Sequence, residues 1–238
     1  MGQITKIGII GDTHGNKKRI KKLLRKYGPQ CDVLVQLGDF GMWQERPGLP
    51  YIATYLGRIE TELTKLGINL YFIDGNHEDF PYLYSFPINK DGFRQITDHI
   101  FHIPRGHTWK WGEKIFMGLG GAVSTDQKYR RKGFDWFMEE EITDEDVAKA
   151  LETPSVDVLF THDGPTSPLT PRSFGFDIDQ KIRASQKKLN QVVTHLEPEV
   201  LFHGHFHHAY EKSYGDFRVV GVASDQESLE ENFTVLRI

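Results

Sequence analysis

Residues 4–14 read Ile-Thr-Lys-Ile-Gly-Ile-Ile-Gly-Asp-Thr-His, an apolar run that ends in glycine and is followed at once by an aspartate and a histidine. A short apolar run bounded by glycine predicts a buried β-strand. Runs of the same kind predict further strands at 33–38, 68–75, 115–121, 156–161 and 199–203. Strands that are apolar almost throughout are typical of sheets covered on both faces.

Helical patterns lie between these strands. In residues 17–28 the apolar side chains recur at spacings of three and four, which predicts one buried helix face. Residues 51–66 and 178–196 also have a helical pattern. A further helix is predicted to begin after Thr143, which is a candidate N-cap with Asp146 as its capping-box partner.

The order of these elements predicts the fold class. The stretch from Tyr210 to Ile238 has the character of strands. Alternating strands and helices followed by strands predict an α/β sandwich of two packed sheets with helices outside. The chain has 238 residues, 38% hydrophobic and 26% charged, which is globular and sufficient for a core without disulfides. We expect one domain over residues 1–238.

Bulk properties exclude several classes of protein. The net charge of −4 does not favour a stable nucleic-acid complex. No apolar run is long enough to span a membrane, and the first residues lack the apolar core of a signal peptide. The single cysteine, Cys31, suits a reducing compartment, so we expect a cytoplasmic protein.

Polar side chains follow five of the predicted strands. In open α/β sheets, sites form beyond the carboxyl ends of the strands. Gly-Asp and Gly-Asn, taken singly, are ordinary turn sequences. Turn chemistry does not explain why histidine occurs at four of the five strand ends. In chain order the residues are Asp12 and His14, Asp39, Asn76 with His77 and Glu78, His162, and His205 with His207.

The residue types favour a metal site. Carboxylates and imidazoles suit Mn, Fe, Ni or Zn better than Ca or Mg, which prefer oxygen alone. No cysteine is in the set, so a structural zinc site built from thiolates is excluded. Such a site leaves positions for water, as hydrolysis requires.

Taken together, the sequence resembles the calcineurin-type metallophosphoesterases. The blocks of that family, D-x-H, G-D, G-N-H-E/D, H and G-H-x-H, occur here in the family order between residues 12 and 207. They are Asp12-Thr-His14, Gly38-Asp39, Gly75-Asn76-His77-Glu78, His162 and Gly204-His205-Phe206-His207.

The resemblance implies a centre of two divalent ions, for which Mn is expected first, with Fe, Ni or Zn also allowed. It divides the seven implied ligands between the ions: Asp12, His14 and His207 on one, Asn76, His162 and His205 on the other, and Asp39 bridging both. His77 would be the general acid that protonates the leaving group. The sequence leaves open whether Asp74 or Asp79 orients His77.

One departure from the family pattern bears on the substrate. Many members follow G-D with a second aspartate and an arginine, whereas Met42 and Trp43 stand at those positions here. An arginine clamp matters most for a dianionic monoester, because it gives bidentate contacts to phosphate. We therefore favour a phosphodiesterase for a small or cyclic nucleotide diester. The alternatives are a serine/threonine-type protein phosphatase or phosphomonoesterase, a nuclease, and a non-catalytic scaffold.

Residues 118–137 are the candidate specificity element. Arg130 and Arg131 are candidate substrate-binding residues for phosphate, although a solvated basic turn explains them as well. The basic helix at 17–28 is likewise open to two interpretations, a contact for phosphate groups or a solvated face. The expected partner is a small phosphate ester such as a nucleotide, and neither a membrane nor a stably bound nucleic acid.

Overall fold

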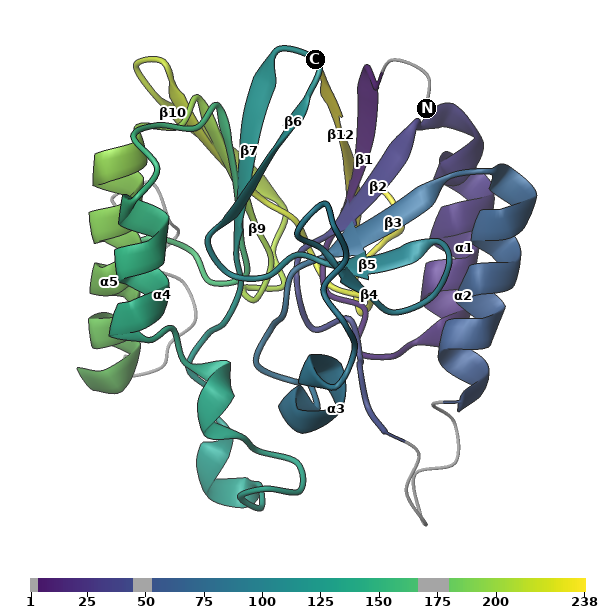
Figure 1. Cartoon of the computed structure of the whole chain (residues 1–238), viewed down its shortest axis with the longest axis horizontal. Helices are drawn as coiled ribbons and strands as arrows, with labels where there is room; N and C mark the ends of the chain where they lie inside the picture. The colour runs from purple at the N-terminus through teal and green to yellow at the C-terminus, as the bar shows by residue number, and fades with distance from the viewer. Residues whose placement is uncertain (1–3, 45–52, 167–179) are drawn as a thin grey trace.

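The computed structural model describes residues 4–44, 53–166 and 180–238. Two six-stranded sheets pack face to face, and a pair of helices covers the outer face of each sheet (Figure 1). The helices of one pair are α1 (Lys17–Tyr27) and α2 (Ala53–Leu66), and those of the other are α4 (Asp144–Leu151) and α5 (Gln180–Leu196). The predicted α/β sandwich is confirmed.

Each sheet has four parallel strands in its centre and one antiparallel strand at each edge. The first sheet has the order β12-β1-β2-β3-β5-β4 and the second has β10-β11-β9-β8-β7-β6. The strands of the first sheet are β1 (Lys6–Ile10), β2 (Val33–Gln36), β3 (Asn69–Phe72), β4 (Arg94–Gln95), β5 (Ile100–His102) and β12 (Phe233–Arg237). Those of the second are β6 (His107–Trp111), β7 (Lys114–Leu119), β8 (Val158–Thr161), β9 (Val200–His203), β10 (Tyr210–Tyr214) and β11 (Phe217–Gly221). Both sheets are therefore mixed.

The apolar strands are buried on both faces because each lies between the other sheet and a helix layer. In β2, Val33 and Val35 belong to the core between the sheets, whereas Leu34 packs in the core under α1 and α2. In β8, Phe160 faces the inter-sheet core and Leu159 faces α4 and α5. This two-sided burial is the physical reason for strands without polar alternation.

Most predicted elements occur where the sequence placed them. Thr143 caps α4, and Asp146 completes the capping box. Residues 51–52 and 178–179 of two predicted helices lie outside the described residues. Sequence patterns did not reveal β4, β5, β6 or the helix α3 (Phe80–Tyr84). The strands β4 and β5 and the helix α3 are short, and the partly exposed edge strand β6 has no continuous apolar run.

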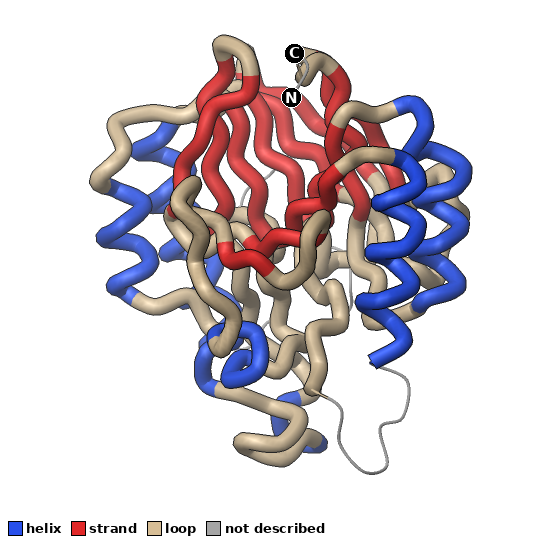
Figure 2. The backbone as a smooth tube through the Cα atoms, turned by 45° about the vertical axis from the view of Figure 1, so that its right-hand side comes forward, coloured by secondary structure: helices blue, strands red, loops and turns tan. Residues whose placement is uncertain are grey.

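The loops that follow the strands gather at one end of the sandwich, below the strands in Figure 2. The described loops after β1, β2, β3, β8 and β9 carry the polar residues of the five sequence blocks. Among the helices of the described ranges, none is long and apolar enough to cross a membrane.

A buried ion pair joins the loop after β3 to the loop after β5. The carboxylate of Asp74 accepts bonds from Nε and Nη2 of Arg105 at 2.9 and 2.6 Å. Burial alone would raise the pKa of Asp74, but the charge of Arg105 and a hydrogen bond from His102 outweigh burial and lower it. Arg105 also donates to the carbonyl of Glu141 at 2.8 Å. The pair therefore fixes the chain that leads from β3 into Asn76.

We expect Arg105→Ala to lower the free energy of unfolding by about 3–5 kcal/mol, because it leaves the buried Asp74 carboxylate without a counter-charge. Denaturant unfolding measures the change. The matched control is Arg218→Ala, which removes an exposed ion pair with Glu211 of 3.0 Å and should change stability by about 1 kcal/mol or less. An equal loss of unfolding free energy in the two variants would show that the pair of Asp74 and Arg105 stabilises the fold no more than an exposed ion pair does.

Candidate metal centre

Main-chain hydrogen bonds hold the loop after β1 against the loop after β2. The amides of Thr13 and His14 both donate to the carbonyl of Asp39, at 3.3 and 2.7 Å. The amide of Gly15 donates to the carbonyl of Phe40 at 3.2 Å. The first two sequence blocks therefore form one joined unit.

Asp39 lies at the centre of the site, with its side chain 2% exposed. Its Oδ2 lies 3.3 Å from Nε2 of His14, and its Oδ1 lies 3.5 Å from Nε2 of His162. Burial would raise the pKa of Asp39, but the neighbouring histidines outweigh it and hold the pKa well below its usual range. The two oxygens thus face two different imidazoles, which is the arrangement of a carboxylate placed between two cations.

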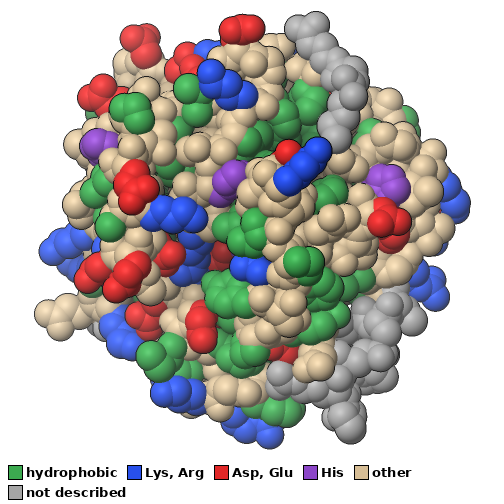
Figure 3. Space-filling view, in the orientation of Figure 1, with side chains coloured by type: hydrophobic (Ala, Val, Ile, Leu, Met, Phe, Trp, Pro, Cys, Tyr) green, Lys and Arg blue, Asp and Glu red, His purple; other side chains and the backbone are tan. Residues whose placement is uncertain are grey.

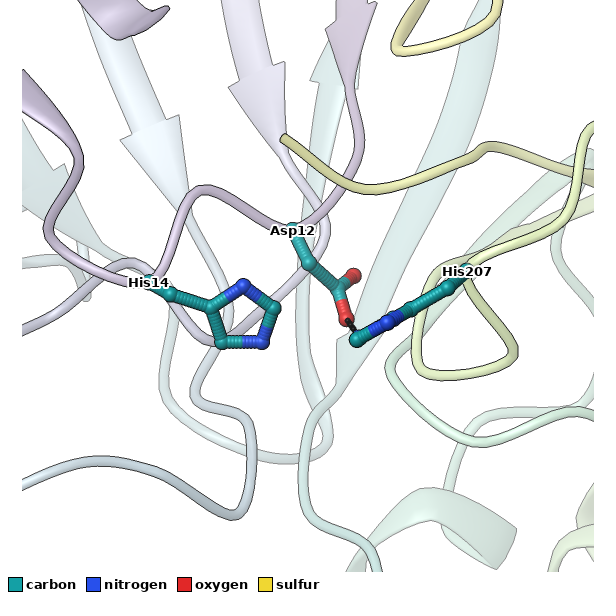
Figure 4. Close-up of side chains that lie close together, drawn as sticks. All are labelled: Asp12, His14 and His207. Carbon is teal, nitrogen blue, oxygen red and sulfur yellow. Dashed lines mark ion pairs between the residues drawn. The ribbon is translucent and has the colours of Figure 1, made fainter. Parts of the chain in front are cut away.

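The first candidate ligand group comprises Asp12, His14 and His207, whose ligand atoms all lie within 4.8 Å of one another. Figure 4 shows Asp12 between the two histidines. Nε2 of His207 is 3.1 Å from Oδ2 of Asp12, and the ring centroids of His14 and His207 are 4.9 Å apart. These three side chains could hold one ion.

The second candidate group surrounds His162, which is fully buried. Its Nδ1 lies 2.7 Å from the carbonyl of Leu37, which can only accept, so Nδ1 carries the hydrogen and Nε2 is left for the site. That Nε2 lies 3.0 Å from Oδ1 of Asn76, and the ring of His205 is 4.9 Å from the ring of His162. Asp12 and Asp39 also share a second metal-compatible group with His162.

His77 lies beside these groups. Its amide donates to Oδ1 of Asp39 at 2.8 Å, and its ring centroid is 6.0 Å from that of His14. Burial lowers the pKa of His77, the charge of Asp39 opposes this effect, and the charge of Arg130 adds to it. The structure thus brings all seven predicted ligands and His77 to one end of the sandwich.

Four of the predicted ligands have backbone angles that non-glycine residues rarely adopt. The φ angles are 44° at His14, 53° at Asp39, 60° at His205 and 53° at His207. Left-handed conformations of this kind cost energy and persist where the surroundings impose them, which is typical of functional sites. The residue types at these positions did not predict a left-handed backbone.

Two glycines make room for ligands from other strands. A Cβ atom on Gly75 would lie 2.1 Å from Oδ1 of Asp39, and one on Gly204 would lie 2.1 Å from Oδ1 of Asp12. Neither carboxylate could keep its place beside a larger residue. Glycine is therefore needed at both positions, because only a residue without a side chain leaves room for the carboxylate of the neighbouring loop.

We expect Gly75→Ala to weaken Mn²⁺ binding strongly, because the new methyl group displaces the Asp39 carboxylate. Calorimetric titration of metal-free protein measures the affinity. The control is Gly57→Ala in helix α2, where an added Cβ would have no neighbouring atom within 4 Å. This variant should bind Mn²⁺ normally and should stabilise the protein by about 1 kcal/mol or less, since alanine favours the helix more than glycine does. Unchanged Mn²⁺ affinity in Gly75→Ala would show that Asp39 can move without loss.

A buried network fixes the carboxamide of Asn76. Its Nδ2 donates to Oγ of Ser124 at 2.9 Å, and that hydroxyl donates to the carboxylate of Glu140. Arg130 binds Glu140 at 2.7 Å and also reaches the carbonyl of Asn76 at 3.3 Å. Because Nδ2 is held by Ser124, Oδ1 is turned towards His162. Sequence reasoning missed Ser124 and Glu140, which belong to none of the blocks.

The two arginines of the candidate specificity element occupy different places. The side chain of Arg130 is 8% exposed and donates to protein acceptors through Nε and both terminal nitrogens. The side chain of Arg131 is 70% exposed, with its guanidinium 3.8 Å from the ring centre of Phe134. Contact of either residue with substrate stays a prediction.

Glu78 shapes the loop after Asp39. Its buried carboxylate accepts backbone bonds from Phe40, Gly41 and Met42, at 2.7, 3.1 and 2.6 Å. Burial, followed by the charge of Asp39, raises the pKa of Glu78 to about 8. The sequence placed Glu78 in a block but did not indicate this role.

The remaining polar residues near the blocks have other partners. His203 is buried with Nε2 2.5 Å from the hydroxyl of Tyr210, while His208 is exposed. Asp74 binds Arg105, and Asp79 caps helix α3 by accepting from the amide of Tyr82 at 3.2 Å. Neither His203 nor His208 belongs to the candidate ligand groups.

The sequence profile of the calcineurin-like phosphoesterases matches residues 5–209, and the chain belongs to this family. No curated protein sequence matches the chain. Among solved structures, the fold is similar to a dimetal phosphatase from Danio rerio, with 12% identity over 99% of this chain and 93% of the other and a TM-score of 0.61. It is also similar to the phosphopantetheinyl hydrolase PptH from Mycobacterium tuberculosis, with 14% identity, 95% and 92% coverage and a TM-score of 0.53.

Proposed function

We propose that this protein is a phosphoester hydrolase that works with two divalent ions. The observation that carries the proposal is the position of Asp39, of which one oxygen faces His14 and the other faces His162. Family membership supports the same chemistry. Asp12, His14 and His207 would hold one ion, Asn76, His162 and His205 would hold the other, and Asp39 would bridge them.

Two bound ions would lower the pKa of a water molecule and neutralise charge on the phosphoryl oxygens. The residues of the chain supply the rest of the chemistry. The imidazole of His77 delivers a proton to the leaving oxygen. The hydrogen bond from the backbone amide of His77 to Asp39 holds this residue beside the centre. Burial around Asp39 and His162 excludes bulk water and strengthens the electrostatic contacts.

A small phosphodiester, such as a cyclic nucleotide, is the proposed substrate. Trp43 stands where many family members have the arginine, and the guanidinium of Arg130 donates to protein groups, so neither residue offers a guanidinium clamp to a dianionic monoester. On the face shown in Figure 3, basic side chains are scattered among acidic ones, which does not favour a nuclease. Mn²⁺ is the proposed metal, and the buried lone Cys31 agrees with a cytoplasmic location.

With Mn²⁺ present, we expect a nitrophenyl phosphodiester to be cleaved much faster than the matching monoester. His77→Ala should lower kcat by roughly 10²–10⁴-fold, since it removes a general acid. The loss should be larger for an alkyl leaving group, which needs the proton, than for nitrophenolate. Steady-state kinetics on the nitrophenyl and alkyl forms of each ester measure these ratios.

In the same assay, Asp39→Ala should be inactive and bind Mn²⁺ poorly, whereas His77→Ala should bind it normally. If the monoester is cleaved faster than the diester, the proposed diesterase activity is wrong, and the protein is a phosphomonoesterase or a protein phosphatase. Equal losses for both leaving groups in His77→Ala would remove the general acid role. A protein that binds Mn²⁺ but cleaves neither ester would be a scaffold.

Metal removal should lower thermal stability as well as activity. Ions that bind only the folded protein stabilise it, by about 2.7 kcal/mol for each site at a hundredfold excess over Kd. We therefore expect Mn²⁺ to raise the thermal midpoint of chelator-treated protein. The rise should be much smaller in Asp39→Ala, and an equal rise in both proteins would place the ions elsewhere.

A further inference from the structure

A carboxylate outside the five sequence blocks contacts one of the predicted ligands. Asp225 lies in the loop after β11, beyond the last residue that the family profile matches. Its Oδ1 is 2.9 Å from Nδ1 of His14. On the basis of the proposed two-metal function, we propose that Asp225 is a positioning residue that orients His14 and strengthens its grip on one metal ion.

The two nitrogens of His14 point to two carboxylates. Nδ1 faces Asp225, while Nε2 lies 3.3 Å from Oδ2 of Asp39. A carboxylate can only accept, so the bond at Nδ1 places the hydrogen there and leaves Nε2 as the ligand atom. A carboxylate on the far nitrogen also makes an imidazole a stronger metal ligand.

His14 needs such support more than His162 does. The side chain of His162 is fully buried, and the carbonyl of Leu37 holds its Nδ1. The side chain of His14 is 27% exposed, and its backbone has the strained φ of 44°. Packing therefore restrains the ring of His14 less, and the bond to Asp225 supplies an orienting contact.

Asp225 is itself held in place by the start of helix α1. Its Oδ2 accepts from Nδ2 of Asn16 at 2.8 Å, and Oδ1 of Asn16 caps the helix by accepting from the amide of Arg19 at 3.1 Å. Nη2 of Arg19 donates to the main-chain carbonyls of Asp225 and Glu227. The carboxylate is thus anchored through its second oxygen and its main chain, as a positioning group requires.

Calorimetric titration of metal-free protein with Mn²⁺ tests the proposal. Asp225→Asn keeps the shape and one acceptor oxygen, but it removes the charge and replaces the other acceptor by an amide donor. We expect it to weaken one of two Mn²⁺ sites by about 10–100-fold and to leave the other unchanged. Electron paramagnetic resonance should then show an isolated ion at Mn²⁺ concentrations that give a coupled pair in the wild type.

Two further variants make the test specific. Glu227→Gln removes a charge from the same loop without contacting His14, and it should bind Mn²⁺ like the wild type. His14→Ala removes the ligand, and it should weaken the same site as Asp225→Asn, more severely. The thermal midpoint of metal-free Asp225→Asn should stay close to that of Glu227→Gln.

Wild-type affinity at both sites in Asp225→Asn would overturn the proposal. So would an equal weakening of both sites together with a lower thermal midpoint, because that result describes a loop that only supports the fold. A wild-type protein that binds no pair of Mn²⁺ ions would instead refute the proposed function, so the two failures are distinguishable.

Discussion

The buried carboxylate of Asp39 is the constraint on which the rest of the site depends. A carboxylate on a residue that is 1% exposed requires nearby positive charge or hydrogen-bond donors. The backbone amide of His77 donates to this carboxylate. His14 approaches it from a loop of the first sheet and His162 from a loop of the second, so the same group joins the two halves of the sandwich. The backbone amide of Thr13 donates to the carbonyl of Asp39, and Gly75 leaves the space that the side chain of Asp39 occupies. A metal ion bound at Asp39 would therefore be coupled to the packing of the two sheets.

The parts of the site that follow directly from strand ends were predictable from sequence. An apolar run fixes where a buried strand stops, and parallel strands deliver their next residues to one end of a sheet. Asp12 and Asp39 come together for that reason, and His162 meets them because the parallel strands of the second sheet end at the same end of the sandwich (Figure 2). The first sheet's fourth parallel strand, β5, escaped prediction because it is only three residues long.

The supporting groups were not predictable, because they act across long separations in the chain. Ser124 and Glu140 meet Asn76 only through tertiary packing, and Asp225 meets His14 across 211 positions. Arg130 looked like a free cation in sequence, yet the fold surrounds it with carbonyls and a buried carboxylate. Residue type and spacing in the sequence do not predict such tertiary partners. They also do not predict the left-handed backbone that His14, Asp39, His205 and His207 adopt in the packed loops.

The pairing of β12 with β1 has a consequence for how the protein is made. Lys6 in β1 pairs with Arg237 in β12, so β1 is synthesised long before its partner strand. Until β12 has left the ribosome, β1 has an open edge that could pair with other chains. The loop carrying Asp225 lies just before β12 in the chain, so the contact between Asp225 and His14 can form only late in synthesis. Contacts between such distant segments also predict slow folding.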